Sequence, residues 1–288
     1  MSTRRPELIF PSEPTLEGAG VHLRRGVGHD RRLIERFDPF LLLDDIHSTN
    51  PENYLAGFPW HPHRGIETVT YVLRGKVDHG DSLGNRGAIG SGDVQWMTAG
   101  SGIVHQEMPQ RWDGDMRGLQ LWVNLPASHK MMSPRYRDVA AATIPECPMA
   151  EGATVKVIAG RVNGCEGPVT DIVRGPTYLD VTVSPGGAFT HPTVPSHTVF
   201  AYVLEGSAGF APGDPRRVAA DHVVLLGAGA AVEVVPGGGG VRFLLFSGEP
   251  LGEPVAWRGP IVMNTEEELD RAFREYRDGT FIKEGRHP

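Results

Sequence analysis

The stretch Glu67-Thr-Val-Thr-Tyr71-Val-Leu-Arg-Gly75 decides the fold class, because it has the features of a β-strand that ends at a glycine turn. Its β-branched and aromatic residues suit a pleated sheet. Gly (37 residues) and Pro (24 residues) punctuate the chain as the turns of a sheet-rich protein require. The sequence therefore predicts an all-β protein, with further strands over 94–97, 119–123, 155–158, 178–183, 199–204, 223–226 and 241–246.

The same stretch recurs later in the chain as Thr198-Val-Phe-Ala-Tyr202-Val-Leu-Glu-Gly206. Two other segments also have a second copy: 92–97 resembles 220–225, and His61-Pro62 resembles His191-Pro192. The three pairs lie 131, 128 and 130 residues apart, so their register is nearly constant. Three ordered matches at one offset indicate a duplicated domain.

The duplication sets the expected domain organisation. We expect an N-terminal domain over residues 1–143 and a C-terminal domain over 144–288, divided near the breaker-rich stretch Pro145-Glu-Cys-Pro148. A short helix is predicted near the end of the chain, because Thr265-Glu-Glu-Glu268 has the pattern of a capping box. The helix is expected to place three apolar side chains on one face: Leu269, Phe273 and Tyr276.

The overall composition limits the class of partner. A net charge of -7 and a pI of about 5.9 disfavour direct binding of nucleic acid. The chain has no run of 18 apolar residues, and residues 1–14 lack the apolar core of a secretory signal. We therefore expect no membrane segment and a cytoplasmic location. We also expect a monomer, because two fused domains would already bury one another's faces. Cys147 and Cys165 lie outside any C-x-x-C motif and are expected to be ordinary thiols.

Two short motifs have the spacing of metal ligands on strands. His61 and His63 are two residues apart, as are His105 and Glu107, so on a β-strand each pair points to one face. Three imidazoles and a carboxylate suit Fe(II), Mn, Ni, Cu or Zn, whereas Ca and Mg prefer mainly oxygen ligands. Open coordination positions would make such a site catalytic.

The second copy of the domain serves as an internal control. Thr193, or Val194 if the register slips, stands where the first copy has His63, and the segment 232–235 stands where it has His105 to Glu107. The ligand set is therefore absent from the second copy. The sequence predicts a metal in the first domain only, and structural or surface roles for His191, His197 and His222.

Longer segments around these pairs resemble the pirin family of cupins. Gly57-Phe-Pro-Trp-His61-Pro-His63-Arg-Gly-Ile-Glu67 is similar to the family's first cupin motif, and Gly92 to Pro109 is similar to its second. The resemblance implies a bicupin, two tandem β-barrels of jelly-roll type, with iron in the N-terminal barrel. The implied ligands are His61, His63, His105 and Glu107. Many cupins instead take a carboxylate from the position of Glu67, but the H-x-E pattern favours Glu107.

The resemblance also implies a function. Pirins resemble quercetinases, and some members open flavonols with dioxygen. A divalent metal, Fe(II) above all, would acidify the hydroxyl of a flavonol-like substrate as a Lewis acid, and Glu107 would take the proton as general base. The alternative is a regulatory protein that senses redox state or metal and acts through a protein partner, without turnover.

Overall fold

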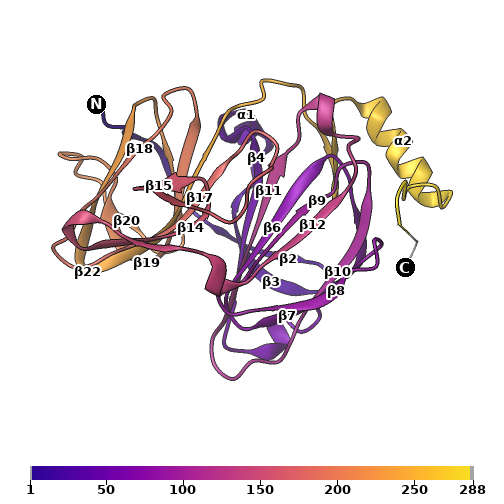
Figure 1. The fold of residues 1–288 in the computed structure, drawn as a ribbon, viewed down its shortest axis with the longest axis horizontal. Helices are drawn as coiled ribbons and strands as arrows, with labels where there is room; N and C mark the ends of the chain where they lie inside the picture. Colours follow the sequence, from indigo (N-terminus) through magenta and orange to yellow (C-terminus); the bar gives the residue numbers. More distant parts are fainter. Residues whose placement is uncertain (1, 286–288) are drawn as a thin grey trace. The chain divides into compact units, whose positions relative to one another are not determined.

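The computed structural model describes residues 2–285 (Figure 1). Its internal contacts divide the chain into two compact units. The N-unit consists of Pro14–Arg25, Phe40–Ala141 and Leu251–Pro288, and the C-unit of Met1–Glu13, Gly26–Pro39 and Ala142–Pro250. Both units are built mainly of antiparallel strands, so the predicted all-β bicupin is confirmed.

Two antiparallel sheets make up most of the N-unit. The larger has the order β12-β9-β6-β11-β4-β3-β2 and the smaller the order β5-β10-β7-β8. The strands of the larger sheet are β2 Glu13–Glu17, β3 Val21–Val27, β4 Phe40–Ser48, β6 Ile66–Arg74, β9 Val94–Thr98, β11 Met116–Asn124 and β12 Arg135–Val139. Those of the smaller are β5 Phe58–His63, β7 Lys76–Asp81, β8 Arg86–Gly90 and β10 Ile103–Pro109.

The end of the chain also belongs to the N-unit. A two-stranded sheet of β23 Ala256–Arg258 and β24 Ile261–Met263 precedes the helix α2 Glu266–Arg277, drawn in yellow in Figure 1. The helix begins where predicted: Thr265 Oγ1 accepts a hydrogen bond from the Glu268 amide (3.2 Å), and the Glu268 carboxylate accepts one from the Thr265 amide (3.1 Å). Leu269 is fully buried in an apolar cluster with Ile261 and Met263, which anchors the helix on β24.

A nine-stranded sheet forms the C-unit, with β1-β21-β19-β22-β17-β14-β13 as its main path, β18 paired to β22 and β20 paired to β19. Its core is a cluster of buried valines, leucines and phenylalanines, with Phe243 at zero exposure. The elements are β1 Pro6–Pro11, α1 Ile34–Phe37, β13 Glu146–Pro148, β14 Ala153–Ala159, β15 Arg161–Val162, β16 Cys165–Glu166, β17 Thr177–Val183, β18 Phe189–Pro192, β19 Thr198–Gly209, β20 Val218–Ala219, β21 His222–Leu226 and β22 Ala231–Gly248.

The strands named from the sequence all lie within strands of the structure, whereas two local features differ from expectation. The four-residue helix α1 was not predicted, because it is too short to show a helical period. Cys147 and Cys165 were expected to be ordinary thiols, but they form a disulfide between β13 and β16. Neither α-helix within residues 2–285 has the length and apolar character needed to cross a membrane.

The two units change over between Ala141 and Ala142, close to the division expected at 143/144, but the two chain ends are exchanged relative to expectation. Strand β1 pairs antiparallel with β21 and so extends the sheet of the C-unit. Helix α2 packs on β24 of the N-unit. Strand β1 covers an edge of the C-unit sheet, and helix α2 covers an apolar surface of the N-unit. A division of the sequence at one point predicts neither contact.

Candidate metal centre

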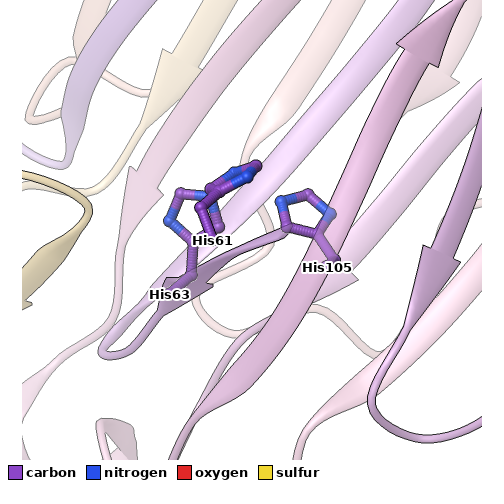
Figure 2. Close-up of side chains that lie close together, drawn as sticks. All are labelled: His61, His63 and His105. Atoms are coloured by element: carbon purple, nitrogen blue, oxygen red, sulfur yellow. The ribbon is translucent and has the colours of Figure 1, made fainter. Parts of the chain in front are cut away.

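Three histidine side chains converge between neighbouring strands of the N-unit. His61 and His63 lie on β5, His105 lies on β10, and His105 is directly opposite His61 in the antiparallel pairing. One ring nitrogen from each lies within 4.8 Å of the others, and Figure 2 shows the rings turned toward one another. The predicted alternation along β5 therefore places His61 and His63 on the same face of the sheet as His105.

Carbonyl groups fix the orientation of two of these rings. Nδ1 of His61 donates to the carbonyl oxygen of Pro59 (2.8 Å), and Nδ1 of His63 donates to that of Pro260 (2.9 Å). Since each proton is on Nδ1, each Nε2 presents a lone pair, and the two Nε2 atoms are only 3.1 Å apart. Two facing lone pairs repel each other unless a cation lies between them.

The third imidazole, that of His105, has a buried ring nitrogen without a hydrogen-bond partner in the described part of the chain. His105 is 2% exposed, and its Nε2 has no hydrogen-bond partner among residues 2–285. Burial lowers the pKa of all three histidines, and for His63 and His105 the nearby imidazoles lower it further. The rings are therefore neutral near pH 7, which is the form that binds a metal. The donor set fits a divalent transition metal.

Glu107 lies on β10, two residues beyond His105, and is 6% exposed. Its Oε1 contacts the Thr70 hydroxyl at 2.6 Å, and Gln120 Nε2 lies 3.4 Å from its Oε2. Burial raises the pKa of Glu107, and the bond from Thr70 opposes that shift. The carboxylate does not join the three-histidine cluster, so its role as a fourth ligand stays a prediction.

Glu67, the alternative carboxylate, belongs to the other face of β6. It accepts a hydrogen bond from the Thr98 hydroxyl (2.6 Å), whereas Thr70 of the same strand contacts Glu107. Positions 67 and 70 differ by an odd number, so their side chains leave the sheet on opposite sides. Glu67 therefore lies on the opposite side of the sheet from Thr70, and the choice of Glu107 over Glu67 as a ligand stays a prediction.

The end of the chain contributes to the site in a way that the motifs did not indicate. Pro260, whose carbonyl orients His63, lies between β23 and β24, and the Arg64 carbonyl accepts a hydrogen bond from the Val262 amide of β24 (3.1 Å). Arg64 is 2% exposed, donates to the carbonyl oxygen of Ser101 (2.7 Å) and pairs with Glu275 of α2 (2.8 Å). Every residue has a backbone carbonyl, so the residue type at position 260 does not indicate this hydrogen bond, and only the structure could reveal it.

The described residues of the C-unit contain no equivalent cluster. Its β18 and β22 pair with His191 opposite Val232, which is the counterpart of His61 opposite His105. His191 is therefore a single imidazole at the matching register, as the repeat predicted. No second group of three or more metal-binding side chains occurs within residues 2–285.

A duplicated β-fold with a cluster of three histidines on adjacent strands of one copy, and no second such cluster within residues 2–285, defines a bicupin with one candidate metal centre. Two family models match the chain: "Pirin" over residues 20–123, and "Pirin C-terminal cupin domain" over residues 178–282. The chain belongs to the pirin family.

Individual relatives agree with this assignment. The chain is 44% identical to a Pseudomonas aeruginosa protein named "putative quercetin 2,3-dioxygenase", over 94% of this chain and 95% of the relative. It is 44% identical to a pirin-like protein of Caulobacter vibrioides, over 96% and 99% of the two chains. Among solved structures, quercetin 2,3-dioxygenase from Acinetobacter baumannii superposes with a TM-score of 0.89 at 32% identity, covering 97% of this chain and 99% of that one.

Proposed function

We propose that the protein is a metal-dependent oxygenase of the quercetin 2,3-dioxygenase type, which opens flavonols with dioxygen and uses Fe(II). The observation that carries this proposal is the group of three neutral imidazoles, together with the buried carboxyl group of Glu107 two residues beyond His105. Nε2 of His105 has no partner among residues 2–285, and the Nε2 atoms of His61 and His63 face each other. The names of the Pseudomonas and Acinetobacter relatives support the choice of substrate.

His61, His63 and His105 would hold the metal through their Nε2 atoms, with Glu107 as a fourth ligand or as an acid–base group beside it. Bound there, a divalent ion would act as a Lewis acid on the hydroxyl of the substrate. Three neutral imidazoles leave the charge of the ion uncompensated, so the site would favour a substrate that becomes an anion.

Glu107 is the residue best placed to move the proton. Thr70 engages its Oε1 at 2.6 Å, whereas Oε2 has only the long contact of 3.4 Å to Gln120, so Oε2 is the freer oxygen. A carboxylate whose pKa is raised by burial is a stronger base than one in water. Glu107 Oε2 would therefore accept the proton of the substrate hydroxyl as the flavonol anion forms.

The test is an aerobic assay with iron-loaded protein and quercetin. We expect the absorption band of the flavonol to disappear with wild type and to persist with Glu107→Gln, while that variant keeps most of its metal by elemental analysis. A band that persists with iron-loaded wild type would overturn the proposal for quercetin. The hypothesis of a metal- or redox-sensing regulator would then account better for the same ligand set.

A further inference from the structure

Strands β6 and β11 place two successive pairs of side chains on the face of their sheet that meets Glu107. In the first pair Thr70 is opposite Gln120, and both contact the Glu107 carboxylate. In the second pair Thr68 is opposite Trp122. Since side chains on a strand alternate, Thr68 and Trp122 share the face of the first pair and lie one step along the sheet from Glu107.

The second pair has polar atoms without partners. The Thr68 hydroxyl and the Trp122 indole N–H are both buried, and neither has a hydrogen-bond partner among residues 2–285. Thr68 is 1% exposed. The Trp122 ring lies edge to face with His63, with the ring centres 5.0 Å apart. The Trp122 ring therefore lies against the three-histidine cluster, and Thr68 is its cross-strand neighbour.

Such groups are costly in a folded protein. A buried donor without a partner loses its hydration without replacement, at a cost of about 1–3 kcal/mol. Opposed side chains on neighbouring strands have Cβ atoms about 5 Å apart, which is close enough for both side chains to contact one ligand. A ligand oxygen that accepts two hydrogen bonds would satisfy both groups, because a carbonyl oxygen has two lone pairs.

We propose that Thr68 and Trp122 form an oxygen-binding subsite that takes the carbonyl oxygen of an aromatic hydroxyketone. The inference rests on the proposed function, and it names the side chains that would recognise the carbonyl group of such a substrate. The hydroxyl of the ligand would lie at the metal and near Glu107, and the adjacent carbonyl would accept from Trp122 Nε1 and Thr68 Oγ1. Aromatic alcohols without the neighbouring carbonyl would leave both donors unpaired.

The experiment compares two ligands with protein loaded with Zn(II), which has no redox chemistry, so that binding is measured without turnover. Quercetin carries the hydroxyl and the adjacent carbonyl, and catechin carries a hydroxyl at the same ring position without the carbonyl. By titration calorimetry, Trp122→Phe and Thr68→Val should each weaken quercetin binding about tenfold, the value of one buried hydrogen bond. Catechin binding should change less than about twofold.

Matched variants separate hydrogen bonding from packing. Trp257 lies beside Trp122, with ring centres 5.9 Å apart, but its indole N–H already donates to the Gly259 carbonyl (2.8 Å), so Trp257→Phe should leave quercetin affinity unchanged. Thr68→Ser keeps the hydroxyl and should retain wild-type affinity. Unchanged quercetin affinity in both Trp122→Phe and Thr68→Val, or equal losses for the two ligands, would overturn the subsite. Because the readout is binding, failure of the oxygenase assay would leave this result interpretable.

Discussion

The two copies of the cupin fold in this chain differ at the strand pairing that carries the histidines. In the N-unit, β5 and β10 bring His61 opposite His105, and His63 completes the cluster. In the C-unit, β18 and β22 pair in the same antiparallel sense, with His191 opposite Val232. One backbone pattern thus carries three clustered imidazoles in one unit and a single imidazole in the other.

A guanidinium lies near the corresponding position of the C-unit. Thr193 has the register of His63, and its hydroxyl accepts a hydrogen bond from Nε of Arg4 (2.8 Å). Arg4 is 1% exposed and also donates to the carbonyl oxygens of Gly227 (2.8 Å) and Val194 (2.7 Å). The comparison indicates that hydrogen-bond acceptors face one another at this position in both units. In the C-unit the Arg4 guanidinium donates to them.

The largest effect is expected from removing two of the three imidazoles. We expect wild type to bind close to one divalent metal per chain, and the double variant His61→Ala, His105→Ala to bind none, because one imidazole cannot retain the ion alone. Elemental analysis after exhaustive dialysis measures the ratio. His191→Ala is the matched control and should keep the wild-type ratio; metal retained in the double variant would place the site elsewhere.

The next largest effect is expected at Arg4. Replacing it with Met keeps much of the side-chain volume but leaves the Thr193 hydroxyl and the carbonyl oxygens of Gly227 and Val194 without their donor, which should cost about 4 kcal/mol of unfolding free energy. Urea unfolding measures the loss. The neighbouring Arg5 is exposed, so Arg5→Met is the control and should change stability by less than about 0.5 kcal/mol. Equal stability of the two variants would show that Arg4 has no special role.

The sequence predicted those parts of the fold that local pattern determines. Strand β6 was identified because its alternation and its closing Gly75 are local signals, and α2 because Thr265 and Glu268 cap it within four residues. The three histidines were found because period-two spacing on a strand dictates a common face. The copy in the C-unit added a comparison that no single motif could supply.

The remaining features depend on contacts between residues far apart in the sequence. Nothing near position 4 indicates that Arg4 would contact Thr193, and nothing near Pro260 indicates that its carbonyl would orient His63. The exchange of the chain ends has the same cause, since β1 and α2 pack by surface fit to distant elements. A residue whose role depends on its backbone, or on one hydrogen bond to a distant residue, leaves no recognisable pattern in a single sequence.

The disulfide is a further difference between the two units, because among the described residues only the C-unit contains one. Cys147 and Cys165 are separated by 18 residues, a loop whose closure is worth about 3 kcal/mol in the chain-entropy model. Cys147→Ser, Cys165→Ser should therefore unfold at lower urea concentration by that amount, and reductant should lower the stability of wild type only. Two free thiols per chain in oxidised, denatured wild type would contradict the disulfide.

The smallest effect concerns His191, the counterpart of His61. Burial lowers its pKa from 6.5 to about 4, so the folded protein keeps this imidazole neutral where an unfolded chain would protonate it. Its contribution to stability is therefore complete above about pH 6.5 and declines as the pH falls toward 4, reaching a loss of about 2 kcal/mol at pH 5. Urea unfolding of metal-free protein at pH 7.5 and pH 5 should show that His191→Gln loses less stability on acidification than wild type, by about this amount. His222→Gln, in the same unit but partly exposed, controls for the loss of a histidine, and an equal acid response in all three proteins would contradict a buried neutral imidazole at this register.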